Sequence, residues 1–405
     1  MTRVLFPDPF IITLNTAVRA LAGRGDVCHV AWPYGWTKRL FKSRYVSEVI
    51  RTPDRNADAE AFADRIVDLC RGGNYDVILP VTTEATEALI SRREDLDRLV
   101  ATLLPTAAQL ALGTDKVETW QLCEELGIAH PRTWSVADTA DLDRVIAAAG
   151  YPVIVKHPRN LGGSRGVRFA GDRDELQLAF EQLRALSDTP TALIIQEFIP
   201  GFLFDAVTVA RNGECPTVFT SARKLMYPVS GGVTCVSVST RTPELKAMAR
   251  RIVQATGWNG PVEIEFKLDP RDNRFKLIEI NPRFWASLAT SVVCGVNFPA
   301  IAVDLALGRP VPASDEHDYG VRHKYMIGRV PYAYWQLARA HGLDAIRDPQ
   351  IYVRSCLDLD AADPMPDLFR LLLFCRDLMK GRFPRRLNRG ASRMIHGLQN
   401  PVLYD

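Results

Sequence analysis

Several signatures of common protein classes are absent from this chain of 405 residues. It has no apolar run of about 20 residues, the length that a transmembrane helix needs, and no charged segment followed by an apolar leader opens it. The eight cysteines are scattered without C-x-x-C or C-x-x-H spacing. This scatter disfavours a zinc site and a disulfide framework, so we expect a cytoplasmic protein in a reducing compartment.

The chain also lacks a large net charge and the common catalytic motifs. The net charge is only +3, which is too small to indicate nucleic acid as a partner. Its distribution is uneven, because residues 367–405 carry eight lysines or arginines against three acidic residues. No G-x-G-x-x-G motif is present, which disfavours a dinucleotide site, and neither a Ser-His-Asp nor a Cys-His signature indicates a protein nucleophile.

The first hundred residues have the pattern of an α/β domain. Predicted strands at 2–7, 27–32 and 75–81 alternate with helical stretches, which predicts a small doubly wound parallel sheet. Ligands of such sheets lie beyond the carboxyl ends of the strands, where Asp8 and Glu84 stand in this chain. With 47% apolar residues and this length, the chain should divide into two or three domains.

The most informative segment is 261–283, with the sequence PVEIEFKLDPRDNRFKLIEINPR. It predicts two alternating strands joined by a polar turn. Glu279 and Asn281 are two residues apart and share a face of their strand, and the hairpin brings Glu265 roughly opposite them. Two carboxylates and an amide oxygen are donors that suit Mg²⁺ or Mn²⁺ beside nucleotide phosphates, and Arg283 adds a positive charge on the same side. The alternative is a solvated edge hairpin whose glutamates face water.

Two segments upstream have the patterns of an anion-binding loop and a hinge. Residues 151–169, YPVIVKHPRNLGGSRGVRF, predict an apolar strand that ends at Lys156, a glycine-rich loop and a second strand. A lysine at the end of a buried strand needs an anionic partner, and glycines let backbone N–H groups approach an anion closely. Residues 193–201, LIIQEFIPG, predict an apolar strand that stops at a bend, and Lys116 stands near the start of a predicted helix.

These segments, in this order, resemble the ATP-grasp superfamily, most closely its carbamoyl-phosphate-synthase-like branch and the uncharacterised bacterial carboxylate–amine ligases. The resemblance rests on motifs over about residues 110–310 and on architecture alone before them. It implies an α/β and α+β fold, in which a small doubly wound parallel sheet domain precedes the two-lobed ATP-grasp fold. The implied boundaries are a pre-ATP-grasp domain at 1–111, a first lobe at 112–200, a second lobe with the metal hairpin at 201–310, and a mainly helical extension with a basic tail at 311–405.

The resemblance also implies roles for individual residues. The metal ligands would be Glu265, Glu279 and Asn281, and Arg283 would stabilise charge at the acyl carbon. The nucleotide would contact Lys116, Lys156, Gly162, Gly163, Ser164, Gly166, Glu197, Phe198 and Ile199. The segment 221–240 would face the acyl substrate, with the candidates Arg223, Lys224, Gly231 and Gly232. Many relatives carry an acidic residue for the ribose after the hinge glycine. This chain has Phe202-Leu203-Phe204 there, and Asp205 is the nearest carboxylate.

The reaction that the resemblance implies is an ATP-dependent ligation. A small-molecule carboxylate would attack the γ-phosphorus of Mg-ATP, and an amine would attack the resulting acyl phosphate to give an amide, ADP and phosphate. Three alternatives stay open: an enzyme that activates bicarbonate, an ATP-binding regulator without catalysis, and a membrane-attached protein that uses its basic C-terminal tail. For that tail, a solvated basic end on a docked helix is the favoured interpretation, and contact with an anionic membrane is the other.

Overall fold

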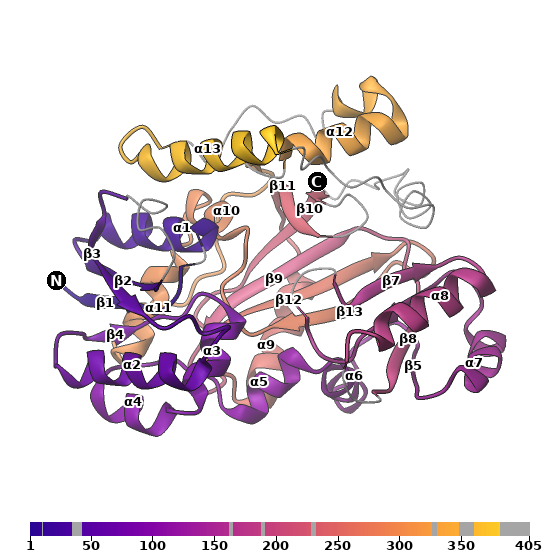
Figure 1. Cartoon of the computed structure of the whole chain (residues 1–405), viewed down its shortest axis with the longest axis horizontal. Helices are drawn as coiled ribbons and strands as arrows, with labels where there is room; N and C mark the ends of the chain where they lie inside the picture. The colour runs from indigo at the N-terminus through magenta and orange to yellow at the C-terminus, as the bar shows by residue number, and fades with distance from the viewer. Residues whose placement is uncertain are drawn as a thin grey trace.

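The computed structural model describes residues 1–9, 11–34, 43–161, 165–187, 191–227, 232–325, 330–347 and 360–380. Within these ranges the chain forms three β-sheets with helices around them, and two further helices lie across one side of the molecule (Figure 1). One sheet is parallel and two are antiparallel, which confirms the mixed α/β character that the sequence predicts.

The N-terminal sheet is parallel, in the order β3-β2-β1-β4. Its strands are β1 (Arg3–Phe6), β2 (Val27–Pro33), β3 (Val46–Thr52) and β4 (Val77–Ile78). Helix α1 (Ile11–Ala22) covers the face that carries Val4 and Phe6. The other face, which carries Leu5, is covered by α2 (Ala59–Arg71), α3 (Thr83–Ile90) and α4 (Arg93–Leu99). Apolar side chains alternate between two covered faces, as a doubly wound sheet requires; strand β3 is not among the predicted strands.

The second sheet is antiparallel, in the order β5-β8-β6-β7. Its strands are β5 (Thr133–Val136), β6 (Val153–Lys156), β7 (Val167–Ala170) and β8 (Leu193–Glu197). The first face packs through Val155 and Ile195 on α7 (Leu142–Ala149), which follows the short 3₁₀ turn Thr139–Asp141, and on α8 (Arg173–Arg184). The alternating residues Lys156 and Ile194 point to the opposite face, toward α6 (Lys116–Glu125), which follows α5 (Ala107–Thr114).

The third sheet has six antiparallel strands in the order β13-β12-β9-β10-β11-β14. They are β9 (Leu203–Ala210), β10 (Phe219–Tyr227), β11 (Val233–Ser239), β12 (Gly260–Asp269), β13 (Arg274–Asn281) and β14 (Arg322–Lys324). One face packs on α9 (Pro243–Thr256). On the other face, Val207 and Phe219 share a hydrophobic core with the N-terminal sheet, α10 (Leu288–Val293) and α11 (Phe298–Ala306). The N-terminal sheet and the third sheet are therefore joined by one continuous core.

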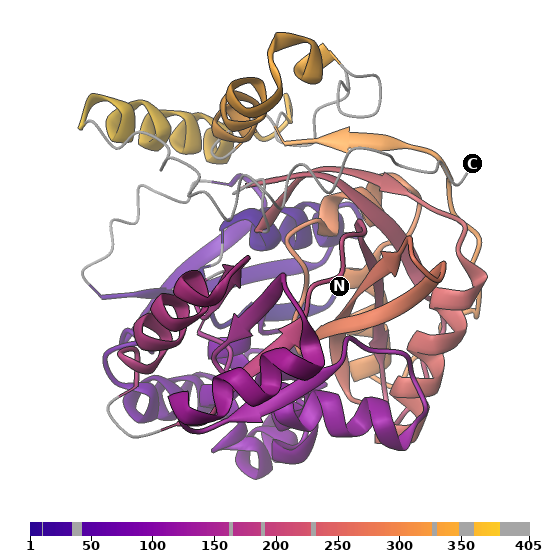
Figure 2. The ribbon, with the colours of Figure 1, turned by 90° about the vertical axis from the view of Figure 1, so that its right-hand side faces the viewer.

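The C-terminal part begins inside this third sheet. Strand β14 belongs to the predicted extension at 311–405, yet it pairs with β11, so the sheet continues past residue 310. The helices α12 (Val330–His341) and α13 (Met365–Met379), with a 3₁₀ turn at Leu343–Arg347 between them, lie on the outside of the molecule (Figures 1 and 2). The side chain of Arg19 in α1 donates hydrogen bonds to Asp363 and Asp367, each at 3.0 Å.

Within the described part of the chain, no helix has both the length and the apolar content to cross a membrane. The seven cysteines found there are all unpaired. The basic segment after residue 380 lies outside the described residues.

Candidate active site between the two lobes

The register of the β12–β13 hairpin decides which side chains meet. Glu265 is paired with Glu279, and Glu263 with Asn281. Cross-strand partners point to the same face of a sheet, so these four side chains form one polar patch. The turn that sets this register contains Asn273, whose φ of 55° lies in the left-handed region that asparagine tolerates. A shift of the pairing beyond Glu265 then accommodates one extra residue on β13.

This patch has the donor set of a divalent-cation site. The Asn281 amide donates from Nδ2 to Oε1 of Glu265 at 3.1 Å, so its oxygen remains as a ligand atom. Oε1 of Glu279 accepts from Asn160 at 3.3 Å. Burial raises the pKa of Glu279; a neighbouring lysine opposes this effect and the Glu265 carboxylate adds to it. Two carboxylates close together, with an amide oxygen beside them, fit a hard cation such as Mg²⁺ or Mn²⁺.

Two lysines from outside the third sheet, one on α6 and one on β6, face this patch. Lys116 begins α6 after the N-cap Asp115, and its Nζ lies 3.8 Å from Oε1 of Glu279. Lys156 ends β6 and is only 7% exposed. Burial lowers the pKa of Lys156 to about 8, although Glu279 counteracts this effect. Lys116 and Lys156 line a narrow cleft with Ile278 that contains only about 20 Å³ of free space.

The predicted hinge follows β8 directly. Oε2 of Glu197 lies 3.3 Å from the backbone nitrogen of Arg132, and its Oε1 lies 2.8 Å from the guanidinium of Arg271. The ring of Phe198 packs edge-on against Phe169 with the ring centres 5.5 Å apart. The carbonyl of Ile199 accepts a hydrogen bond from the ammonium of a half-buried lysine, Lys267, at 2.8 Å.

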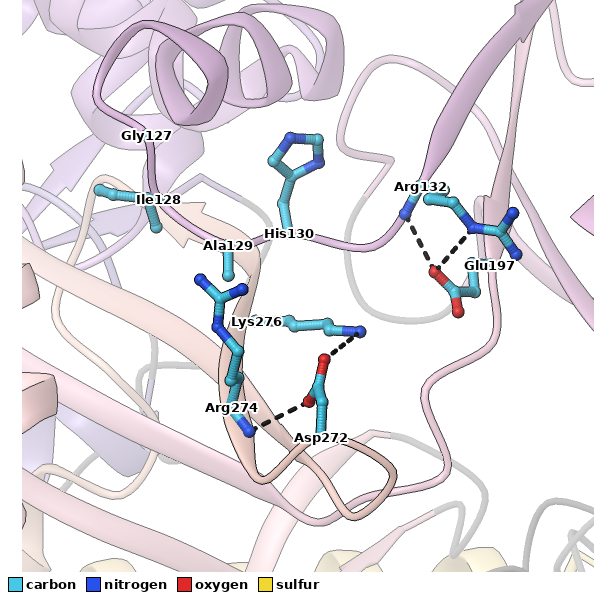
Figure 3. A pocket seen from close by; sticks show the side chains of 9 residues that line it. All are labelled: Gly127, Ile128, Ala129, His130, Arg132, Glu197, Asp272, Arg274 and Lys276. Carbon is cyan, nitrogen blue, oxygen red and sulfur yellow. Dashed lines mark hydrogen bonds and ion pairs between the residues drawn. The ribbon is translucent and has the colours of Figure 1, made fainter.

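Figure 3 shows the cavity of about 400 Å³ beside Glu197. It lies between the loop 127–130 and the turn of the β12–β13 hairpin, and is lined by Gly127, Ile128, Ala129, His130, Arg132, Glu197, Asp272, Arg274 and Lys276. The hinge can pass close to β12 only because residue 201 is glycine, since a Cβ there would lie 1.5 Å from the carbonyl oxygen of Leu268. Glu197 thus connects the end of β8 with Arg132 before β5 and with Arg271 in the hairpin turn.

The candidates for the substrate side lie on different faces of β10. Arg223 points to the polar patch and is 7% exposed; its Nε donates to Asp205, and one terminal nitrogen donates to Asp205 and Glu263. Lys224 points to the other face, with its Nζ 5.6 Å from the centre of the Phe202 ring. Gly232 precedes β11, whereas Gly231 lies outside the described residues.

Three further predicted residues have definite places. Asp205, the nearest carboxylate to the hinge, is fully buried and accepts from Arg223 through both of its oxygens. Arg283 donates to Oε2 of Glu263 at 2.8 Å and to the carbonyl of Phe284 at 3.0 Å. The carbonyl of Gly166 accepts from the backbone N–H of His157, while Gly162, Gly163 and Ser164 lie outside the described residues.

The structure adds three residues to the site that the sequence analysis does not single out. Glu263 and Lys267 lie on β12 on either side of Glu265, at intervals of two residues, so the strand alternation already places them on its face. Asn160 reaches Glu279 from the loop after β6, and no sequence pattern indicates that contact.

Comparison with known proteins identifies this arrangement. The family model described as carbamoyl-phosphate synthase L chain, ATP binding domain, matches residues 115–314. The chain is 25% identical over 288 residues to the arginine-specific large chain of carbamoyl phosphate synthase from Lactiplantibacillus plantarum, covering 66% of this chain and 28% of that protein. It is 27% identical over 256 residues to N5-carboxyaminoimidazole ribonucleotide synthase from Synechococcus elongatus, covering 58% and 60%. The matches therefore span less than two thirds of the length of these relatives.

Solved structures agree in fold. Biotin carboxylase from Campylobacter jejuni, in a complex with an ATP analogue, superposes with a TM-score of 0.66 at 17% identity, over 79% of this chain and 74% of that chain. N5-carboxyaminoimidazole synthetase from Staphylococcus aureus, complexed with ADP, superposes with a TM-score of 0.64 at 14% identity, over 81% and 83%. The segment 115–314, about half of the chain, is therefore an ATP-grasp domain of the carbamoyl-phosphate-synthase type.

Proposed function

We propose that the chain is an ATP-dependent ligase that activates a small-molecule carboxylate as an acyl phosphate and joins it to an amine. Membership of the ATP-grasp superfamily supports an ATP-dependent ligase or carboxylase activity. The observation that supports the more specific proposal is that Lys116 and Lys156 face the patch of Glu265, Glu279 and Asn281. Cations on one side and oxygen ligands on the other suit a metal-bound polyphosphate.

In this proposal the phosphates lie beside Lys116 and Lys156, and Glu265, Glu279 and Asn281 hold the cation. Bound Mg²⁺ would supply charge neutralisation at the β- and γ-phosphates. The hinge at 197–199 would border the adenine, and Gly162, Gly163, Ser164 and Gly166 stay candidates for contacts with the phosphates. The cleft beside the lysines holds only about 20 Å³ of free space, far less than a nucleotide needs, so we expect it to widen on binding.

The first chemical step transfers the γ-phosphoryl group. A carboxylate oxygen of the substrate forms a bond to the γ-phosphorus while the bond to the β–γ bridging oxygen breaks, and ADP leaves. The ammonium groups of Lys116 and Lys156 both lie beside the carboxylate patch that would hold the cation. Phosphates bound to that cation would therefore lie next to both lysines, which stabilise their negative charge. No protein nucleophile is needed for this transfer.

The second step forms the amide. The amine nitrogen bonds to the acyl carbon, the C–O bond to phosphate breaks, and the amine proton passes to solvent. Arg283 is the candidate for stabilising the oxyanion, because its guanidinium lies at the edge of the patch with 26% of the side chain exposed. Lys224, Gly231 and Gly232 remain candidates for the acyl substrate.

An oxygen-transfer experiment tests the acyl phosphate. Carboxylates are screened against amines for ADP release, and the active carboxylate is then supplied with ¹⁸O in both carboxyl oxygens. We expect one ¹⁸O in each released phosphate, measured by mass spectrometry. The Glu279→Gln variant is the inactive control. Release of ADP with unlabelled phosphate would contradict the acyl phosphate and leave only hydrolysis of ATP.

The same assay tests a second candidate function, the activation of bicarbonate. The similarity to N5-carboxyaminoimidazole ribonucleotide synthase supports an enzyme in which bicarbonate is the activated acid. ADP release that depends on bicarbonate, with ¹⁸O passing from labelled bicarbonate to phosphate, would favour this candidate over an organic carboxylate.

A further inference from the structure

Three carboxylates form a cage that shares Glu265 with the proposed cation site. The oxygens of Asp205, Glu263 and Glu265 lie within 4.8 Å of one another, and all three residues are buried. Asp205 is paired with Glu265 across β9 and β12, so the strand register brings them together. Three buried carboxylates at this spacing repel one another strongly unless a cation lies among them.

The cation in this cage is the guanidinium of Arg223. It binds Asp205 through two contacts, at 2.6 and 2.9 Å, and reaches Glu263 at 3.0 Å and Glu265 at 2.8 Å. Burial alone would lower the pKa of Arg223, but the surrounding carboxylates outweigh burial and raise it well above its usual value. Arg223 therefore carries a permanent positive charge inside the protein.

Arg223 connects a proposed metal ligand, Glu265, with Arg283, the candidate for stabilising charge at the acyl carbon. Oε1 of Glu265 forms an ion pair with Arg223 and accepts a hydrogen bond from Asn281, and these two contacts fix the carboxylate that would hold the metal. Glu263 uses one oxygen for Arg223 and the other for Arg283, at 3.0 and 2.8 Å. One buried guanidinium thus orients a proposed metal ligand and, through Glu263, the arginine at the acyl side.

We propose that Arg223 is a positioning residue that acts as a built-in cation, occupying a carboxylate cage that would otherwise take up a divalent metal ion. The inference rests on the proposed function where it concerns Glu265 and Arg283. The occupied cage itself depends only on the contacts of Arg223. A guanidinium offers forked hydrogen bonds in fixed directions, whereas a metal ion would exchange with solvent and leave Glu265 free to move.

Manganese binding tests the cage without knowledge of the substrates. Free Mn²⁺ is titrated by electron paramagnetic resonance against the full-length wild type and the variants Arg223→Ala and Arg223→Lys, with and without ADP. We expect Arg223→Ala to bind one additional Mn²⁺ per chain in the absence of nucleotide, and Arg223→Lys to bind none in addition, since its ammonium still fills the cage. Guanidinium chloride at millimolar concentration should displace the additional Mn²⁺ from Arg223→Ala.

The same titration with ADP tests the positioning role. Arg223→Ala and Glu263→Gln should each weaken the binding of Mn²⁺ with ADP at least tenfold, and added guanidinium should restore it in Arg223→Ala only. The control is Arg250→Ala, which removes an arginine paired with Asp315 at 2.6 Å on the outside of α9; it should bind like the wild type. Glu263→Gln keeps the shape of the side chain, so it gives an answer even where Arg223→Ala does not fold.

The outcomes separate the two proposals. Failure of the wild type to bind Mn²⁺ with ADP would contradict the proposed function, whereas the nucleotide-free titration still decides whether the cage takes up metal. An Arg223→Ala protein that folds, binds no additional Mn²⁺ and keeps wild-type affinity for Mn²⁺ with ADP would overturn the built-in cation. Wild-type affinity in a folded Glu263→Gln protein would overturn the link to Arg283.

Discussion

Individual carboxylates of this site differ in what surrounds them. Glu263 and Glu265 are almost fully buried and contact the guanidinium of Arg223, whereas Glu279 keeps 26% of its side chain exposed and faces Lys116. The exposed carboxylate is therefore the one that an incoming cation meets first. The buried ones are held in place by the protein.

Replacement of Glu279 by glutamine tests this difference. Glu279→Gln removes one negative charge and preserves the shape, so the affinity for Mn²⁺ with ADP should fall at least tenfold, and turnover should fall by orders of magnitude. The unfolding free energy should change by less than about 1 kcal/mol, because burial already raises the pKa of this group. Titration calorimetry measures the affinity, with the exposed Glu94→Gln as the control. Unchanged metal affinity would contradict the role of Glu279 as a ligand.

The sequence predicts some of these residues and misses others for a physical reason. Glu265, Glu279 and Asn281 follow from alternation within one hairpin, which is a local pattern. The partner of Arg223 cannot be found in this way, because Asp205, Glu263 and Arg223 come from three strands whose alignment depends on the whole sheet. The alternation that indicates Glu265 also places Glu263 on its face, so this residue could have been predicted.

At the scale of elements, the end of β13 is positioned by a helix packed against it. A Cβ at Gly113 of α5 would lie 2.6 Å from Cδ of Pro282, and Pro282 stands between Asn281 and Arg283. Glycine at this helical position lets the two backbones approach, at a cost of roughly 1 kcal/mol in helix propensity relative to alanine.

Gly113→Ala should therefore impair the site although residue 113 touches no substrate in our proposal. The added methyl displaces Pro282, so the unfolding free energy should fall by about 1–3 kcal/mol, and the affinity for Mn²⁺ with ADP should fall with it. Gly23→Ala, with 3.8 Å to its nearest neighbour, is the matched control and should change neither. A folded Gly113→Ala protein with wild-type stability and affinity would show that the contact does not position β13.

The turn between β12 and β13 depends on one buried carboxylate. Asp269 is fully buried and accepts hydrogen bonds from Arg271 at 2.8 Å and from Lys276 at 2.5 Å. Burial alone would raise the pKa of Asp269, but these hydrogen bonds outweigh burial and lower it well below its usual range. Arg271 also binds Glu197, so the same turn is connected to the hinge.

Asp269→Asn should destabilise the hairpin in a pH-dependent way. Loss of the charged hydrogen bonds should lower the unfolding free energy by about 2 kcal/mol at pH 7. Because the folded-state pKa is the lower one, the stabilisation is present above about pH 4, the pKa of an aspartate in an unfolded chain, and is lost as the pH falls below it. Hydrogen exchange of the amides at 262–281 measures this difference at pH 7 and at pH 3. An equal difference at both pH values would contradict an ionised Asp269 as its source.

At the scale of the whole molecule, contacts between distant segments decide what the sequence can predict. The parallel sheet and the β12–β13 hairpin are local patterns and are predicted, whereas β3 is not among the predicted strands. The core that joins Phe6 to Phe284 and Phe298 links segments almost 300 residues apart. No sequence periodicity indicates such a core. The domain boundary expected at residue 111 does not predict that the segments on either side of it share one core.

The outer helix α13 carries an apolar stripe on its exposed side. Met365, Leu368, Leu372 and Met379 follow one another at intervals of three, four and seven residues and are 39%, 48%, 61% and 82% exposed. That spacing places them on one face of a helix. The opposite side is anchored to the body through Asp367, which binds Arg19. Residues 378–404 that follow contain six lysines or arginines and no acidic residue.

An apolar helix face beside a basic segment fits the surface of an anionic bilayer, where the leucines enter the interface and the cations meet the headgroups. We expect the full-length protein to co-sediment with vesicles that contain phosphatidylserine and not with vesicles of phosphatidylcholine alone. Truncation after Gly381 removes five arginines, each worth about 1 kcal/mol near such a surface, so binding should be lost in the truncated chain and at high salt.

The double variant Leu368→Ser with Leu372→Ser should weaken binding to these vesicles as well. Leu178→Ser, an equally exposed leucine on α8, is the control and should not. Sedimentation that is equal for all forms, or absent for all, would instead favour a solvated tail, and a shift of the double variant from dimer to monomer would show that a second copy covers the stripe.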